Sequence, residues 1–134
     1  MPKEQATVLF ANEMFYSAFR AGDFATMKTL WSDRHAVGCI HPGWQALSGR
    51  DVVLSSWARI LEGGGNPVLC HHPQVLLYDD VALVLCYEQL GESVLAASNL
   101  FVQEEEGWRL VHHQAGPCAV SLEEIVEPRP AVLQ

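Results

Sequence analysis

Residues 108–117 read WRLVHHQAGP, and residues 41–50 read HPGWQALSGR. The later stretch is typical of a β-strand that carries two adjacent histidines, His112 and His113. The earlier stretch begins with His41, and the proline and glycine that follow end a short predicted strand. Because the chain has only 134 residues, histidines from both stretches can line one cavity. The two stretches therefore predict a pocket, although they do not name a reaction.

The residues around the later stretch have the pattern of an antiparallel sheet. Four β-rich runs are separated by short polar or glycine-containing turns, and they span 68–78, 81–90, 94–103 and 108–115. A further short strand is expected at 35–40. We therefore predict a curved, mainly antiparallel sheet of four to five strands.

Three helices are predicted before this sheet. From Gln5 to Ala21 apolar side chains recur every three or four residues, as in an amphipathic helix. Asp23 is placed to accept hydrogen bonds from the free amides of a second, short helix, and Asp51 lies in the first turn of a third. Helices followed by strands indicate an α+β fold with the helices on one sheet face. Residues 1–134 are predicted to form one domain, with a loosely held tail from about residue 121.

Composition excludes several classes of protein. Sixteen acidic and eight basic residues give a net charge of -8, which disfavours contact with nucleic acid. No apolar run approaches the ~20 residues of a membrane-spanning helix, and no secretory signal is visible, so we expect a cytoplasmic protein. The four cysteines form no Cys-x-x-Cys pair, and free thiols are expected.

Three short segments, in this order and spacing, carry a resemblance to a known family. They are Ala21-Gly22-Asp23 between two helices, Leu47-Ser48-Gly49-Arg50 before the third helix, and Trp108-Arg109-Leu110-Val111-His112-His113. Across nearly its full length the chain resembles the SnoaL-like branch of the NTF2-like superfamily. The resemblance implies a cone in which a bent sheet wraps a long helix around an apolar cavity. It also implies a homodimer formed through the outer face of the sheet.

The superfamily contains ketosteroid isomerase, polyketide cyclases, dehydratases and a non-catalytic kinase association domain, so the fold alone does not settle the function. Alignment with the isomerase puts His41 at its general-base position, Phe15 at its oxyanion tyrosine and Asn99 near its protonated aspartate. Phe15 has no hydroxyl to donate, which argues against steroid isomerisation. Tyr16 lies about 100° further round the helix and is not expected to replace the missing phenol.

Alternation along the last strand allows only one histidine of the pair to face the cavity. We favour His112, because it shares a face with Trp108 and Leu110. The alternative, that both histidines have structural roles, stays open. Pro73 predicts a bulge or a sheet edge beside His71 and His72. The six histidines show no compact ligand spacing, so no metal site is expected.

Several further side chains are candidates to line a ligand pocket. Glu88 interrupts an apolar strand, where it needs a partner such as Arg50 or else lies at an exposed strand end. Trp44 follows the bend after His41 and is expected to contact a ligand. The predicted ligand-binding set is Phe15, Trp44, Trp57, Glu88, Phe101 and Trp108. No cofactor is expected, because the glycines at 63–65 follow a helix and lack a phosphate-binding pattern.

Two functional hypotheses follow from these residues. In the first, the protein binds a small apolar or aromatic molecule and catalyses a cofactor-free proton shift, cyclisation or elimination, with His41 as the base and with Asn99 and His112 orienting the substrate. In the second, the same fold is a non-catalytic ligand-binding or oligomerisation module. The expected partners are a small organic molecule and a second copy of the chain, with neither nucleic acid nor membrane.

Overall fold

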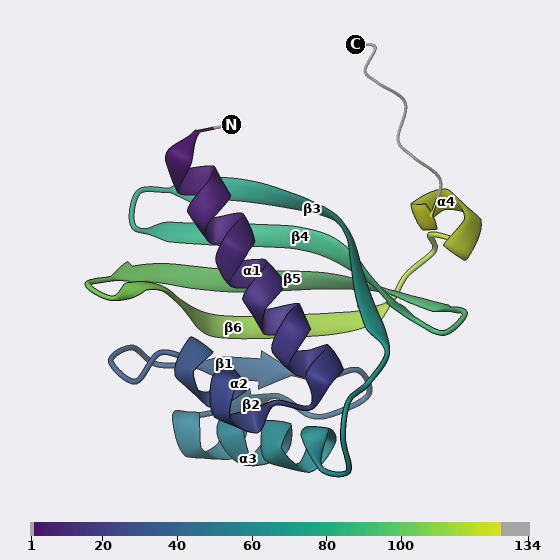
Figure 1. Ribbon diagram of the computed structural model, residues 1–134, viewed down its shortest axis with the longest axis horizontal. Coiled ribbons are helices and arrows are strands. Elements are labelled where there is room, and N and C mark those ends of the chain that lie inside the picture. Colours follow the sequence, from purple (N-terminus) through teal and green to yellow (C-terminus); the bar gives the residue numbers. More distant parts are fainter. Residues whose placement is uncertain (1, 127–134) are drawn as a thin grey trace.

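The computed structural model describes residues 2–126 and shows helices on one face of a single sheet. The helices are α1 (Lys3–Ala21), α2 (Phe24–Leu30), α3 (Arg50–Leu61) and α4 (Leu122–Val126). The strands are β1 (Gly38–Ile40), β2 (Leu47–Ser48), β3 (Val68–Tyr78), β4 (Val81–Leu90), β5 (Ser93–Glu104) and β6 (Gly107–Pro117). Helix α1 crosses the long strands diagonally, while α2 and α3 lie toward β1 and β2 (Figure 1).

The predicted α+β class is confirmed, but the numbers of elements differ from the prediction. The sheet has six strands in the order β2-β1-β6-β5-β4-β3, and four helices lie within the described residues. Strand β2 has two residues and α4 has five, so neither is long enough to show a periodic pattern. All neighbouring strands are antiparallel except β1 and β6, which are parallel.

The junction between α1 and α2 explains why the sequence needs glycine there. Gly22 ends α1 with φ 67°, a left-handed conformation that favours glycine. A Cβ at this position would lie 2.5 Å from the backbone carbon of Gly64, so the turn after α3 packs directly against the end of α1. Asp23 then begins α2, because its Oδ1 accepts a hydrogen bond from the amide of Thr26 at 3.0 Å, as predicted.

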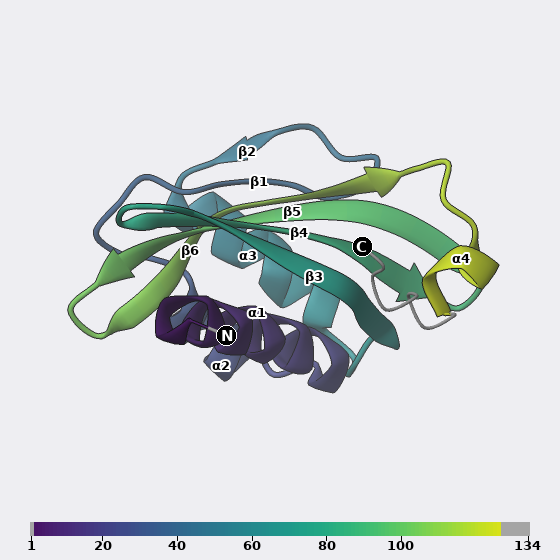
Figure 2. The same ribbon diagram turned by 90° about the horizontal axis from the view of Figure 1, so that it is seen from above.

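The four long strands curve around the helices (Figure 2). Strand β3 lies at the edge of the sheet, and its register with β4 shifts between His71 and Gln74. The bulge or edge predicted from Pro73 is therefore confirmed on both counts.

A second irregularity lies in β6. Leu100 pairs with His112, and Phe101 pairs with Leu110, so Val111 is an extra residue on β6. A bulge of this kind reverses the alternation of the side chains that follow it. The prediction that His112 faces inward is therefore wrong, because it assumed unbroken alternation from Leu110.

The end of the described chain packs on β3. Ser121 and Glu124 cap α4 reciprocally, since the amide of Glu124 donates to the Ser121 hydroxyl and the amide of Ser121 donates to the Glu124 carboxylate. Ile125 is buried, and its carbonyl oxygen lies 2.9 Å from Nε2 of His72. The predicted loose tail thus begins with a docked helical turn, and its remainder, 127–134, lies outside the described residues.

The core fills the space between the helices and the inner face of the sheet. Its largest buried side chains are Trp31, Trp57, Tyr16, Phe15, Phe101, Met27 and Leu110. Among residues 2–126 the four cysteines are free thiols, as expected. None of the helices in this range combines the length and the apolar character that crossing a bilayer requires.

Candidate functional site

Five hydrogen-bonded polar side chains lie in the core between α1 and the inner face of the sheet. Helix α1 supplies Asn12 and Tyr16, and strands β4, β5 and β6 supply Glu88, Asn99 and His113. Each of the five is at most 2% exposed. Buried polar groups in such numbers need partners, and these groups satisfy one another. We refer to these five residues as the polar cluster.

The strand register and the helix period bring the cluster together. Asn12 and Tyr16 are four residues apart, so they lie one above the other on the buried face of α1. Asn99 on β5 is directly opposite His113 on β6. Glu88 is on the inward face of β4, because alternate residues of a strand point to the same side.

Tyr16 and Asn99 link the helix to the sheet. The Tyr16 hydroxyl donates to Oε2 of Glu88 at 2.7 Å. Asn99 Nδ2 donates to Oδ1 of Asn12 at 2.9 Å and to the Tyr16 hydroxyl oxygen at 3.2 Å. Oδ1 of Asn99 lies 2.5 Å from Nδ1 of His113. The cluster is therefore a continuous chain of hydrogen bonds from Glu88 to His113.

This chain assigns the tautomer of His113. Because Asn99 Nδ2 donates to two oxygens, its Oδ1 is the acceptor, and Nδ1 of His113 carries the proton. In the neutral imidazole Nε2 then has a free lone pair, and it lies 3.8 Å from Oε2 of Glu88. At this separation Glu88 and His113 are neighbours without a hydrogen bond between them.

Burial shifts the titration of both members of this acid–base pair. It raises the pKa of Glu88 to about 7, although the hydrogen bond from Tyr16 opposes the shift. Burial, followed by the nearby His41 and His112, lowers the pKa of His113 to about 3. Burial, followed by the charge of Glu88, raises the pKa of Tyr16 well above its ordinary value. At neutral pH His113 and Tyr16 are uncharged, and Glu88 is near its titration midpoint.

His41 lies next to the cluster with one ring nitrogen already occupied. Its Nε2 lies 2.9 Å from the hydroxyl oxygen of Ser56, and that hydroxyl donates to the carbonyl oxygen of Val53 at 2.6 Å. The Ser56 oxygen therefore accepts from Nε2–H, which leaves Nδ1 of neutral His41 unprotonated. Burial lowers the pKa of His41 to about 4.

Aromatic rings enclose His41 on two sides. Its ring centroid lies 4.8 Å from Trp44 and 4.8 Å from Trp57, both in edge-to-face geometry, and 6.3 Å from the ring of His113. The His41 ring is only 3% exposed and so faces the interior, not bulk water. Trp44, on the loop between β1 and β2, is partly exposed and covers His41 from outside.

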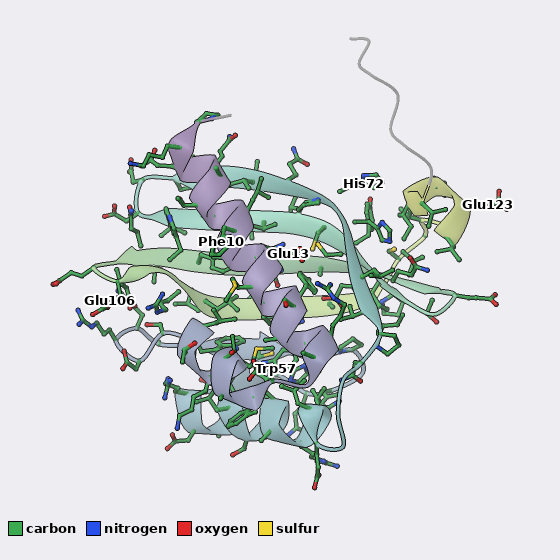
Figure 3. The ribbon with its side chains drawn as sticks, viewed as in Figure 1. Phe10, Glu13, Trp57, His72, Glu106 and Glu123 are labelled. Carbon is green, nitrogen blue, oxygen red and sulfur yellow. The ribbon has the colours of Figure 1, made fainter. Side chains whose placement is uncertain are left out.

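Trp57 reaches from α3 beneath α1 and closes the other wall of the site (Figure 3). Its ring contacts Phe15 and Phe19 edge-on at 5.4 and 5.0 Å and lies 5.7 Å from the ring of His113. It is fully buried, yet its Nε1–H has no hydrogen-bond partner among residues 2–126. An unpaired buried donor costs about 1–3 kcal/mol, so this group favours any acceptor that reaches it.

The structure places the remaining predicted residues around this site with different exposures. Phe15, Phe101 and Trp108 are buried in the aromatic core. His112 is half-buried, and its Nδ1 lies 3.2 Å from the carbonyl oxygen of Gly38 on β1. It therefore joins β1 to β6 and does not reach the polar cluster.

One further expectation was wrong. Arg50 does not pair with Glu88, because it donates to the backbone carbonyls of Ser32 and Lys28. Tyr16 lies with Phe15 on the buried face of α1, and its hydroxyl donates to Glu88.

Three members of the polar cluster, Asn12, Tyr16 and His113, were not among the predicted site residues. The signal for the first two is a polar pair four residues apart within the apolar stripe of α1. No sequence signal locates the bulge that turns His113 inward.

The polar cluster is closed in this structure. Five surface hollows formed by residues 2–126 are lined by other residues, and because the cluster is buried, entry to it requires side chains to move. Over the same range, no group of three histidine, cysteine or acidic side chains is arranged to hold a metal ion.

The fold and a match over most of the chain define the class of protein. The model of the SnoaL-like domain family matches residues 8–119, and the chain belongs to that family. A solved structure from Streptomyces avermitilis, a dehydratase candidate of the NTF2-like family, is 34% identical. The match covers 86% of this chain and 96% of that chain, with a TM-score of 0.76.

Two other relatives show how widely the domain is used. A candidate association domain of calcium/calmodulin-dependent protein kinase type II from Thiobacillus denitrificans is 27% identical, with a TM-score of 0.70, over 84% of this chain and 96% of that chain. The F-box protein SKIP8 of Arabidopsis thaliana is 23% identical over 122 residues, which are 89% of this chain and 53% of that protein. The chain spans about half the length of this curated relative.

Proposed function

We propose that this SnoaL-like domain binds a small apolar or aromatic carbonyl compound beside the polar cluster and moves a proton on it. The observation that carries the proposal is the buried carboxyl of Glu88, in contact with Tyr16 and His113 inside an aromatic core. Its pKa near 7 lets it take up or release a proton at neutral pH. The dehydratase candidate from Streptomyces avermitilis, at 34% identity, supports a proton-transfer reaction.

A purely structural role explains the polar cluster less well. Burying a carboxyl is costly even with partners, and an apolar side chain of similar size would pack the same space at lower cost. Buried titratable groups with shifted pKa values are concentrated at functional sites. Glu88 therefore serves as the proton acceptor, and the neutral His113 beside it brings no positive charge that would lower the pKa of Glu88.

Donors for the substrate oxygen are available on the helix side of the cluster. The Nε1–H of Trp57 is buried without a partner among the described residues. The Tyr16 hydroxyl donates to Glu88 in this structure and can turn to a substrate oxygen once Glu88 carries a proton. Both groups are preorganised by packing, as stabilisation of a developing enolate requires. Asn99 holds Tyr16 and His113 in place through its amide, which refines its proposed role from a substrate donor to a positioning residue.

His41 takes a secondary place in this proposal. Its Nδ1 is unprotonated and therefore chemically able to accept a proton. With a pKa of about 4, however, it is a weaker base than Glu88 at neutral pH. Trp44 covers His41 from the solvent side, so displacement of its ring is the proposed route by which a ligand enters.

Exchange of α-protons tests the proposal without knowledge of the natural substrate. The ketone 2-tetralone is incubated with the protein in D2O, and loss of its α-proton signals is followed by 1H NMR. Wild type is expected to accelerate exchange over buffer, and Glu88→Gln to reduce that rate by about 10²-fold or more, as expected for a lost general base. The matched control is Glu92→Gln, an exposed carboxylate in the turn between β4 and β5.

Two outcomes would contradict the proposal. One is a wild-type rate equal to that of buffer despite saturable binding of the ketone. The other is an unchanged rate in Glu88→Gln, which would move the base elsewhere.

A non-catalytic module is the second candidate function. It is favoured by the closed hydrogen bonding within the polar cluster and by the 27% identity to the kinase association domain candidate. We propose for it the homodimer through the outer sheet face, where Leu85 is 39% exposed beside a hollow lined also by Ala96 and Gln114. Native mass spectrometry distinguishes the two, since a dimer with no bound molecule and no proton exchange favours the module.

A further inference from the structure

A surface hollow separate from the polar cluster is lined by residues of the end of α2, the start of α3 and the turn between β5 and β6. Its volume is about 350 Å³. Glu106, labelled in Figure 3, marks the hairpin side of the hollow. None of the five residues of the polar cluster lines it.

Basic side chains are concentrated around this hollow, although the chain as a whole is acidic. Lys28, Arg34, Arg50 and Arg109 all line it, which is four of the eight basic residues in a chain of net charge -8. Three carboxylates, Asp33, Glu104 and Glu106, line it as well. Whether the hollow attracts anions therefore depends on which of these charges are already paired.

Two of the three carboxylates are occupied. Glu106 lies 3.5 Å from Arg34. Glu104 accepts from the Ser32 hydroxyl at 2.6 Å and lies 2.8 Å from Nδ1 of His35. These two acidic groups therefore have partners on the segment after α2.

Three of the cations have no carboxylate partner. Arg50 donates to the carbonyls of Ser32 and Lys28, both at 3.1 Å, and Arg109 donates to the carbonyl of Trp108 at 3.2 Å. Among residues 2–126, no acidic side chain lies within 4.0 Å of Lys28, Arg50 or Arg109. Against them stand Asp33, which has no ion pair in the same range, and Glu104, whose partners are a serine hydroxyl and an imidazole that is counted as neutral at pH 7. Beside the pair of Arg34 and Glu106, the side chains around the hollow therefore carry an excess of one positive charge.

Trp31 gives an independent indication of a ligand. It lines the hollow and is 1% exposed, but its Nε1–H has no hydrogen-bond partner in the described part of the chain. A buried donor without a partner carries an uncompensated desolvation cost. An acceptor atom that reaches Nε1 when the neighbouring side chains move would remove that cost.

We propose that this hollow is an oxyanion site for a dianionic group, a phosphate monoester. The excess of positive charge, with three cations that have no carboxylate partner, attracts the negative charge of a phosphate monoester at neutral pH. Guanidinium groups bind phosphate oxygens through paired N–H donors, and Arg50 is held in position by its two carbonyl bonds. The site lies outside the proposed proton-transfer centre and does not depend on it.

The indole signal of Trp31 provides the test. Phenyl phosphate and inorganic phosphate are titrated into 15N-labelled protein, and the four indole N–H signals are followed, with sodium chloride at matched ionic strength as the reference. The Trp31 signal is expected to shift saturably with both phosphates and not with chloride. Assignment uses Trp31→Phe.

Lys28→Gln and Arg109→Gln test the cations. Each is expected to weaken phosphate binding by at least about tenfold, in line with the loss of one charge-assisted contact. Arg59→Gln removes the same charge from α3 outside the hollow and is expected to leave the affinity unchanged. Arg50 is left intact because it supports the end of α2.

Equal shifts with chloride, or unchanged affinity in both Lys28→Gln and Arg109→Gln, would overturn the proposal. Unchanged thermal unfolding of these variants shows that any loss of binding is local. Loss of binding in Arg59→Gln as well would also count against the site, because it would indicate attraction by overall charge alone.

Discussion

Replacing Glu88 by glutamine is expected to change how the stability of the protein depends on pH. Glutamine has the shape of the protonated side chain but cannot ionise. Its amide oxygen can take the place of Oε2 and accept from Tyr16, so the hydrogen bond of the neutral state is kept. The substitution therefore removes the titration and little else.

The raised pKa of Glu88 determines the direction and the size of this change in pH dependence. Because the pKa of Glu88 rises from 4.5 in the unfolded chain to about 7 in the native state, the native protein holds this proton more tightly. The stability it contributes is complete below about pH 4.5 and is lost as the pH rises to about 7. The difference between the two pKa values corresponds to about 3 kcal/mol in the free energy of unfolding.

His41 and His113 act in the opposite direction. Their pKa values are lowered to about 4 and about 3, so the stability that depends on them is present above about pH 6.5 and is lost as the pH falls. Wild type and Glu88→Gln both contain these histidines. The difference in stability between Glu88→Gln and wild type therefore isolates the carboxyl.

The assay is urea unfolding followed by tryptophan fluorescence at several values between about pH 4.5 and about pH 8. The free energy of unfolding of Glu88→Gln, minus that of wild type, is expected to rise by about 3 kcal/mol across this range. The exposed Glu92→Gln serves as the control and should show a constant difference. A constant difference for Glu88→Gln too would refute the reasoning, because Glu88 would then ionise as easily in the native protein as in the unfolded chain.

Three further predictions concern the surroundings of the site. Tyr16→Phe removes the donor to Glu88 and should cost about 1–3 kcal/mol in urea unfolding, and an effect below this range would mean that the hydrogen bond is not made. Gly65→Ala should lower the free energy of unfolding by about 2 kcal/mol or more, since a Cβ would lie 1.7 Å from a carbonyl oxygen of α1, and a stable variant would contradict this packing. In 15N NMR titrations the rings of His41 and His113 should stay neutral down to about pH 5, whereas midpoints near 6.5 would show solvent-exposed rings.

Local chemistry made most of the fold predictable from the sequence. The apolar period of α1, the capping Asp23 and the turns between the long strands each act over a few residues, so their signals lie within a short window. The parallel pairing of β1 with β6 and the two-residue strand β2 are contacts between distant segments. No local pattern encodes them.

The site was harder to predict, because a single extra residue in β6 decides which histidine faces inward. Val111 forms the bulge in β6, and the inward histidine is therefore His113 and not His112. A bulge depends on how the neighbouring strand pairs, which alternation alone does not show. The burial of Glu88 was one of the two alternatives considered, but its partner is Tyr16 on α1 and not Arg50. That contact depends on the width of the buried helix face.

The most direct test of the central claim is the titration of the Glu88 carboxyl itself. Protein labelled with 13C at the glutamate side-chain carboxyl is followed by NMR from about pH 3 to about pH 9, and the Glu88 signal is identified by its absence in Glu88→Gln. The midpoint is expected near 7, as burial beside Tyr16 and His113 requires. A midpoint near 4.5, the ordinary value for glutamate, would contradict the account of this cluster as a proton-transfer site.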